Sequence, residues 1–293
     1  MIPTSFCRSW SRNRAAKRRA SDEGDSTKLS KLPPIGILCA LAAGGPARGD
    51  EGVATGVGTR FSQTSTPLTN GQGTLEWVFT HRFNQNVKDA GGGSLGGLDS
   101  GAAIGFGVAY VFVPNVAVEV YRVNNYADYE FALKATLVRP HASFPLGLGV
   151  RGGLDWRTAA YAPKETSAFG QVLLSYSIAN RVTFAAAPSY TANTQFQTDV
   201  FNVPVVLQLK ITKSIAVIGE FVPKKNFLPD SVAQWTVAIE KQIFHHRFAV
   251  WMGNTQATTV DQYIGGDYSG GITDKNMKIG FNLSRAWDLF PAK

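Results

Sequence analysis

Four short turns recur along this chain, and each is flanked on both sides by segments in which apolar and polar residues alternate. The connections between the turns are longer and rich in Gly, Asn, Asp and Ser. The turn segments are residues 111–118, 177–182, 211–215 and 243–248. Short turns at one end and long loops at the other predict an antiparallel up-and-down β-barrel of the bacterial outer-membrane type.

The alternation places about twelve strands of roughly 8–14 residues, near the ~9–11 residues with which a tilted strand spans a bilayer. In the fourth strand, for example, Tyr129, Phe131 and Leu133 share one face, while Glu130 and Lys134 lie on the other. An even count puts both termini on the same, periplasmic side. We therefore predict an all-β, antiparallel up-and-down transmembrane β-barrel of about 12 strands. The predicted spans are 74–83, 101–113, 116–123, 126–138, 143–157, 166–179, 181–191, 199–212, 214–223, 232–244, 246–254 and 276–288.

Two other all-β folds also produce alternating patterns. A soluble β-sandwich buries one face of each strand, but its second face would not explain why charge and apolarity are separated so strongly in strand after strand. A β-propeller would show a repeated blade motif, and none recurs here. No apolar run approaches the ~18 residues of a transmembrane helix, so a membrane assignment rests on the strands.

The net charge of +8 is concentrated in residues 1–50, which carry +5. Residues 51–293 therefore carry only +3. Charged residues make up 17% of the chain, against roughly 25% in soluble domains. The basic excess fits targeting rather than nucleic-acid binding.

A basic flank with Lys28 and Lys31 precedes the short apolar segment 35–43, and Ala40-Leu41-Ala42 has the pattern of a cleavage site. A second candidate cleavage site ends at Ala47. This arrangement predicts a secretory signal peptide. We expect residues 1–47 to be an N-terminal extension plus a cleaved signal peptide, 48–72 a periplasmic lead-in, and 73–293 the barrel. Both cysteines lie in the first of these segments, so the mature part has no disulfide.

Charged residues on the strands must face the lumen, because an Arg or Lys in mid-bilayer costs about 2–4 kcal/mol. Two interpretations remain open: a salt-bridged interior that rigidifies the barrel, or a polar pore. Barrels of about 8 strands are filled and those of 16–18 are open, so twelve is intermediate. The predicted lumen-lining residues are Glu76, Arg82, Glu119, Glu130, Lys134, Arg151, Asp155, Arg157, Lys210, Glu220 and Glu240.

No catalytic residue, metal site or cofactor is predicted. The two Gly-x-Gly-x-x-Gly segments, 91–96 and 147–152, lack the strand-to-helix context of a dinucleotide site. His81 is predicted to face lipid, and a hydrolase would need a serine beside it on a neighbouring strand. Aspartates 261, 267 and 274 miss the spacing of a calcium loop, so we expect them in a solvated external loop.

Several segments resemble an uncharacterised bacterial outer-membrane β-barrel family, known only as a domain of unknown function. The resemblance covers about residues 55–290. It implies a barrel, without a substrate or catalytic residues. Barrels of this kind usually end on an aromatic residue that the assembly machinery recognises, whereas here Phe290 is followed by three more residues. The segments are 68–71, 80–83, 97–100, 129–134 and 279–285.

We therefore expect a protein of the bacterial outer membrane, exported through a cleaved signal peptide. Its expected partners are outer-membrane lipid, the barrel-assembly machinery and small solutes, with no nucleic acid. The expected function is a narrow, non-enzymatic pore or channel for small solutes or ions. A structural or interaction barrel with an occluded lumen is the alternative, and an outer-membrane hydrolase is the third possibility.

Overall fold

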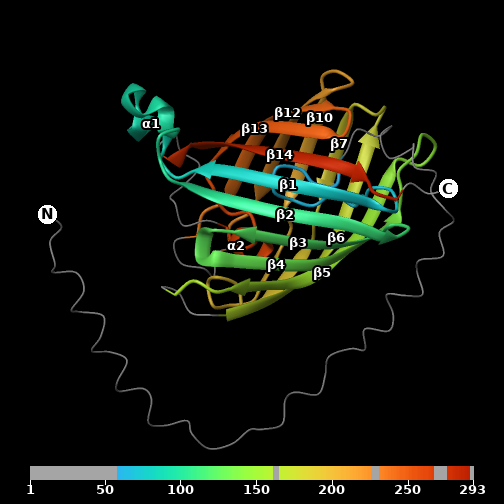
Figure 1. Ribbon diagram of the computed structural model, residues 1–293, viewed down its shortest axis with the longest axis horizontal. Coiled ribbons are helices and arrows are strands. Elements are labelled where there is room, and N and C mark those ends of the chain that lie inside the picture. Colours follow the sequence, from blue (N-terminus) through green and yellow to red (C-terminus); the bar gives the residue numbers. More distant parts are fainter. Residues whose placement is uncertain (1–57, 161–164, 226–230, 267–275, 291–293) are drawn as a thin grey trace, which may run out of the picture. The chain divides into compact units, whose positions relative to one another are not determined.

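The computed structural model describes residues 58–160, 165–225, 231–266 and 276–290. The predicted signal peptide therefore lies outside the described residues. The chain forms strands joined by loops and a few short helices (Figure 1). In chain order the elements are β1 (Thr74–Phe83), α1 (Val87–Ala90), η2 (Gly92–Gly97), β2 (Ala102–Val113), β3 (Val116–Val123), η3 (Asn125–Ala127), β4 (Asp128–Val138), β5 (Leu146–Arg157), β6 (Glu165–Ile178), β7 (Val182–Ala186), β8 (Ser189–Ala192), β9 (Val200–Asn202), β10 (Val205–Lys210), β11 (Ile215–Val222), β12 (Gln234–Ile243), β13 (His246–Gly253), α2 (Val260–Tyr263) and β14 (Lys278–Asp288).

The strands close into an antiparallel ring. Neighbouring strands pair around the ring, and β1 pairs with β14 to close it. β6 pairs with both β7 and β8, β7 with β10, and β8 with β9. The pairs β7/β8 and β9/β10 are the halves of two broken strands, so the barrel has twelve strands, as predicted. The breaks fall at Pro188 and Pro204, where proline supplies no N–H to the ladder. The Ala187 N–H donates to the Pro204 carbonyl at 2.9 Å, which keeps the broken strands joined.

Short turns gather at one end of the barrel. They join β2 to β3, β6 to β7, β10 to β11 and β12 to β13, as the sequence predicts. Asn115, Ala179 and Asn180 have positive φ angles in these turns, which tight hairpins require. The start of β1 and the end of β14 lie at this same end, because Thr74 pairs with Asp288. No helix in the part of the chain that the structure describes is long and apolar enough to cross a membrane.

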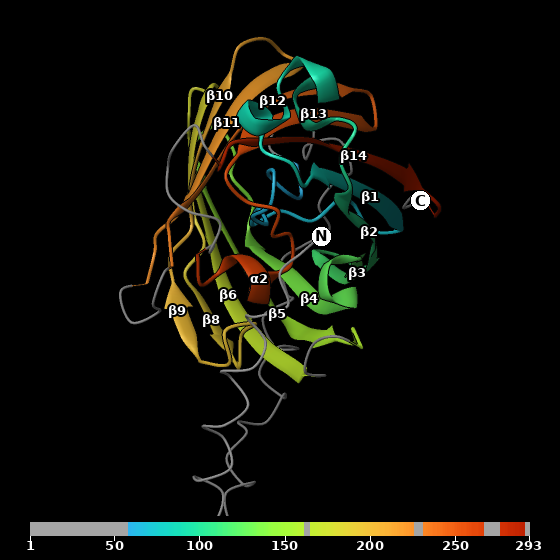
Figure 2. The same ribbon diagram turned by 90° about the vertical axis from the view of Figure 1, so that its left-hand side faces the viewer.

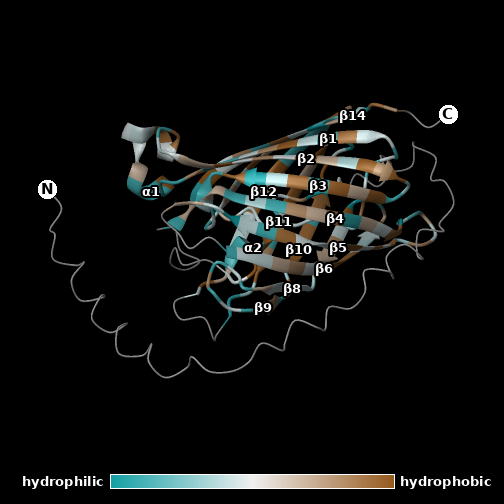
Figure 3. Cartoon of the chain, turned by 60° about the horizontal axis from the view of Figure 1, so that its bottom comes forward, coloured by the Kyte–Doolittle hydropathy of each residue, from teal (hydrophilic) through white to brown (hydrophobic). Residues whose placement is uncertain are grey.

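The strands expose apolar side chains and bury charged ones. Phe106, Leu133 and Val250 are 50%, 45% and 52% exposed, whereas Glu130 and Lys134 are each 1% exposed. Hydrophobic residues lie along the strands in Figure 3. This inside-out pattern would be unfavourable in water. It suits a lipid environment, in which the hydrocarbon replaces water around the outer face and the polar groups turn inward.

Candidate functional site: the filled lumen

The wall of the barrel presents small side chains to its interior at many positions, beside large ones such as Trp251 and Leu173. Along β2 the buried alternate positions are alanines and glycines, and β4 and β5 add further ones. These small inward residues leave space inside the barrel for other segments of the chain. The small inward residues are Ala103, Gly105, Gly107, Ala109, Ala117, Ala132, Gly147, Gly149, Ala185, Ala238 and Ala249.

Residues 58–70 fill this space, and we call them the plug. Figure 2 shows this blue segment enclosed by the ring of strands. Residues 61–69 are all buried. Within the described residues, the expectation of a periplasmic lead-in is therefore wrong for the plug. Its Thr- and Ser-rich sequence looks solvent-exposed, but a polar lumen offers the same hydrogen bonds that water would. Gly149 lets the backbone of Pro67 approach the wall, since a Cβ there would meet the Pro67 carbonyl oxygen at 2.7 Å.

The Glu220 carboxylate of β11 binds three consecutive backbone N–H groups of the plug. Ser62 N–H donates to its Oε1, Gln63 N–H donates to Oε1 at 3.1 Å, and Thr64 N–H donates to Oε2 at 3.1 Å. The Thr64 hydroxyl adds a fourth bond at 2.9 Å. Successive N–H groups that converge in this way form an anion-binding nest. Glu220 is thus the anion that this turn of the plug is shaped to receive.

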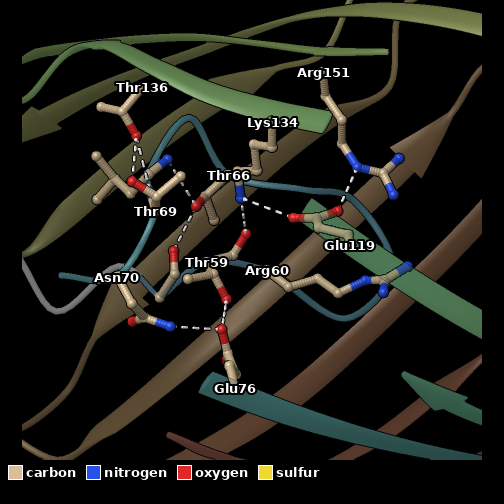
Figure 4. Close-up of polar contacts among 12 residues, drawn as sticks. Thr59, Arg60, Thr66, Thr69, Asn70, Glu76, Glu119, Lys134, Thr136 and Arg151 are labelled. Carbon is tan, nitrogen blue, oxygen red and sulfur yellow. Dashed lines mark hydrogen bonds and ion pairs between the residues drawn. The ribbon is translucent and has the colours of Figure 1, made fainter. Parts of the chain in front are cut away.

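Other wall residues bind the two ends of the plug (Figure 4). Lys134 Nζ donates to the Thr59 carbonyl at 2.6 Å, and the Thr59 hydroxyl donates to Glu76 at 2.6 Å. At the far end the hydroxyls of Thr69 and Thr136 lie 3.1 Å apart. Positive wall residues thus bind carbonyl groups of the plug, and negative wall residues bind its hydroxyl and N–H groups.

Arg82 of β1 also binds the middle of the plug. It donates to the Ser62 carbonyl at 3.2 Å, and its guanidinium lies 4.5 Å from the centre of the Trp251 ring. Asn282 donates to the same carbonyl at 2.8 Å. Both Arg82 and Trp251 are almost fully buried. The turn at residues 62–64 is therefore bound both through its N–H groups and through the Ser62 carbonyl.

A second segment, residues 254–266 with α2, enters the lumen at the end opposite the short turns (Figure 2). Val260, Tyr263 and Ile264 are each at most 1% exposed and pack with Phe169 of the wall. The Tyr263 hydroxyl accepts a bond from Gln171 at 3.0 Å. We call residues 254–266 the α2 segment.

Asp261 of α2 is completely buried, so the expectation that it lies in a solvated loop is wrong. The two other aspartates of that loop lie outside the described residues. Burial, and next the neighbouring Asp128 carboxylate, raise the pKa of Asp261 well above its usual range. Arg157 lies 3.3 Å from Asp261 and offsets part of this effect. The α2 segment thus brings a carboxyl group against wall carboxyl groups.

The predicted lumen-lining residues lie on the inner side of the wall. Glu76, Arg82, Lys134 and Glu220 bind the plug, while Glu130, Asp155 and Arg157 contact the α2 segment. Arg151 lies between them and pairs with Glu119 at 2.7 Å and with Glu130. Glu240 pairs with Arg247 at 2.6 Å, and Lys210 is half-buried at the end of β10.

Two small cavities border the plug. Two cavities of about 30 Å³ each lie between Arg60 and the wall, one bordered by Glu240 and Arg247 and the other by Glu119 and Arg151. Each has room for about one or two water molecules. Within the described residues, the plug and the α2 segment thus occupy the lumen.

His81 lies on the outer face, as predicted, but among aromatic rings. Its ring centre is 4.5 Å from that of Phe83 and 5.1 Å from that of Phe281. Its register partners on the neighbouring strands are Ile104 and Phe281. The arrangement that a serine hydrolase requires, with a serine paired to the histidine, is not present at these positions.

Three solved structures with a similar fold are outer-membrane proteins. Outer membrane phospholipase A from Escherichia coli is 11% identical, with 74% of this chain and 91% of that one covered and a TM-score of 0.41. An outer membrane channel from Pseudomonas putida F1 is 8% identical, with 75% and 97% covered and a TM-score of 0.44. OmpT of Vibrio cholerae is 13% identical, with 62% and 64% covered and a TM-score of 0.35. At these levels the likeness carries no inference about activity.

No curated protein matches the sequence. The family described as "Membrane bound beta barrel domain" (DUF5777) matches residues 57–287, most of the chain and all twelve strands except the last residue of β14. This match agrees with the inside-out distribution of charged and apolar side chains on the wall. The chain belongs to this family of membrane-bound β-barrel domains, whose function is unknown.

Proposed function

We propose that this protein is a gated, non-enzymatic pore of the bacterial outer membrane, closed at rest by the plug and the α2 segment. Small solutes or ions would pass when these segments leave the lumen. The short-turn end would face the periplasm, as it does in barrels of this type. Outer-membrane lipid and the barrel-assembly machinery would then be its partners.

The observation that supports a pore is that two segments inside the barrel do not belong to the sheet. The wall contributes small residues, charged residues and some large side chains such as Trp251 and Leu173, but residues 58–70 and 254–266, which also fill the lumen, are not part of the sheet. A purely structural barrel could fill its lumen with large wall side chains, as barrels of about eight strands do. Here, withdrawal of the two segments would leave a polar bore without breaking any strand pairing.

The contacts of the plug are also of a reversible kind. The polar contacts are hydrogen bonds between wall side chains and plug backbone or hydroxyl groups, and water could replace them after withdrawal. The plug residues Phe61 and Leu68 also pack in an apolar cluster with the wall residue Trp251. The wall would then expose acids and bases in similar number. Because opposed charges cancel the field that sorts cations from anions, we expect weak conductance with little charge selectivity.

A structural barrel with a permanently occluded lumen is the second candidate. The dense bonding at Glu220 and the small size of the two cavities beside Arg60 favour it. The two candidates differ in whether the plug ever leaves the lumen.

A disulfide lock can decide between them. The Thr69 and Thr136 hydroxyls are 3.1 Å apart, so Thr69→Cys with Thr136→Cys places two thiols within bonding reach across the plug–wall contact. Ser177→Cys with Thr183→Cys is the matched control, because those hydroxyls are 3.0 Å apart and join two wall strands. Both pairs are made in a Cys7→Ser, Cys39→Ser background.

Single-channel recording in planar bilayers is the measurement. The gated-pore account expects steps from the parent barrel, their loss when the 69–136 disulfide forms, and their return on reduction. The 177–183 disulfide should leave the steps unchanged. If the parent barrel, verified as folded by its heat-modifiable gel mobility, never conducts, the pore is wrong and the structural barrel takes its place. Steps that persist in the locked barrel would contradict gating by the plug.

A further inference from the structure

Three buried aspartates from three separate elements meet where the α2 segment docks on the wall. They are Asp128 of β4, Asp155 of β5 and Asp261 of α2, and each is 0% exposed. One carboxylate oxygen of each lies within 4.8 Å of the others. Oxygen ligands around one Ca²⁺ ion, each about 2.3–2.6 Å from the metal, can be up to roughly 5 Å apart. The spacing therefore suits a single ion at the centre.

The arginines near the cluster do not supply enough positive charge to neutralise its carboxylates. Arg157 contacts Asp261, but it also pairs with Glu165 at 2.9 Å. Arg151 is shared between Glu119 and Glu130. The acids around α2 therefore outnumber the guanidinium groups that contact them. Buried carboxylates without partners are normally either neutralised or bound to a metal ion.

Gln262 supplies an observation that is independent of the acids. It is 1% exposed, and its Nε2 donates to Asp128 Oδ2 at 2.9 Å, so its amide lies at the cluster. Its Oε1 is buried and accepts no hydrogen bond. Asp128 Oδ1 and Asp155 Oδ1 are likewise buried without a hydrogen bond. Unsatisfied buried oxygens of this kind cost stability unless a partner reaches them.

We propose that Asp128, Asp155, Asp261 and Gln262 form a Ca²⁺ site that fixes the α2 segment to the barrel wall. The available ligands are carboxylate, amide and hydroxyl oxygens, the last from Thr259, whose hydroxyl bonds to Asp128 at 2.7 Å and to Asp261 at 2.9 Å. Such an all-oxygen set selects a hard divalent cation. Ca²⁺ tolerates its irregular geometry, whereas Mg²⁺ demands a near-ideal octahedron and shorter bonds.

The site goes beyond the proposed pore function and does not depend on it. Its ligands come from the wall and from the α2 segment together, so the site forms only when that segment is docked. Binding of the ion and docking of the segment are then linked, and removal of the ion would loosen this end of the lumen.

Calorimetric titration of the folded barrel in detergent, after treatment with a chelator, tests the site directly. CaCl₂ should bind with a stoichiometry of one per chain, and MgCl₂ should bind at least tenfold more weakly. Asp155→Asn and Asp261→Asn should each weaken Ca²⁺ binding at least tenfold, and Gln262→Ala severalfold. The control is Asp199→Asn, because Asp199 is an exposed acid that bonds to Tyr190 and does not belong to the cluster.

A thermal melt provides the second measurement. Ca²⁺ should raise the melting temperature of the parent and of Asp199→Asn, and a chelator should reverse the rise, whereas the two cluster variants should not respond. Absence of Ca²⁺ binding by the parent at millimolar concentration would overturn the proposal and leave carboxyl groups that share protons. Equal binding by the cluster variants, or a preference for Mg²⁺, would overturn it as well.

Discussion

The plug and the α2 segment both fill the lumen, but the wall binds them in different ways. The plug offers backbone groups, and charged wall residues bind several of them, such as Glu220 for N–H groups and Lys134 for a carbonyl. The α2 segment brings its own carboxylate, Asp261, against the wall acids Asp128 and Asp155. At the plug, charged wall residues meet backbone groups of complementary polarity, whereas at the α2 segment carboxyl groups meet other carboxyl groups. This difference predicts that equal charge removals at the two places have opposite effects.

The largest effect is expected from Glu220→Gln. The amide has one acceptor oxygen in place of a carboxylate and adds a donor that faces the plug N–H groups. We expect the free energy of unfolding to fall by about 2–3 kcal/mol, since hydrogen bonds to a buried charged group are lost. The midpoint of urea-induced unfolding measures it. An unchanged midpoint would contradict the role of Glu220 in holding the plug.

Asp155→Asn is the matched charge removal at the α2 segment. Without Ca²⁺ it should raise the free energy of unfolding by about 1–2 kcal/mol, because a buried carboxylate without a hydrogen-bond donor on Oδ1 is replaced by a neutral group. The same urea titration, run in chelator, gives the value. A loss as large as that of Glu220→Gln would erase the contrast between the two segments.

The dependence of stability on pH sharpens the same contrast. Burial raises the pKa of Asp261 above its ordinary value of 3.8, so the folded state binds its proton more tightly than the unfolded state does. The stability from this group is present below the ordinary value and is lost as pH rises through the raised value.

In chelator, lowering the pH through that window should therefore stabilise the parent relative to Asp261→Asn. The difference between the two melting temperatures, followed from pH 7 downward, isolates this group from the other carboxylates. A difference that does not change with pH would show that Asp261 titrates normally.

The smallest effect is expected at the edge of the plug. Thr69→Val removes the hydroxyl that lies 3.1 Å from Thr136 and accepts a bond from Arg139 at 3.2 Å. Arg139 keeps its bond of 2.8 Å to the Thr69 carbonyl. We expect a loss of about 0.5–1.5 kcal/mol, measurable by urea unfolding. A greater loss than that of Glu220→Gln would show that the plug is held mainly at its end and not at Glu220.

The barrel itself was predictable from local patterns. The alternation of Phe131 and Leu133 with Glu130 and Lys134 reports the strand and both of its faces at once. The short turns between alternating segments mark the hairpins. The predicted spans 181–191 and 199–212 were single strands, and the structure shows that Pro188 and Pro204 break them. Proline inside a strand was the available signal for these breaks.

The filling of the lumen was not predictable in the same way. The plug has no periodicity, and its Thr, Ser and Gln residues look like an exposed segment because polar composition normally accompanies solvent exposure. Asp128 and Asp155 lie on neighbouring strands, but nothing local indicates that Asp261, more than a hundred residues later, folds back onto them. Contacts of this kind depend on the closed barrel, which brings distant segments to one place.

Hydrogen exchange at the backbone amides of Ser62, Gln63 and Thr64 tests the central claim most directly. If the plug lies in the lumen on Glu220, these amides in the folded, lipid-embedded barrel exchange as slowly as those of the wall strand β1. Glu220→Gln should then accelerate their exchange while β1 stays protected. Exchange in the parent barrel as fast as that of an unstructured chain would show that residues 58–70 do not occupy the lumen, and would contradict the account.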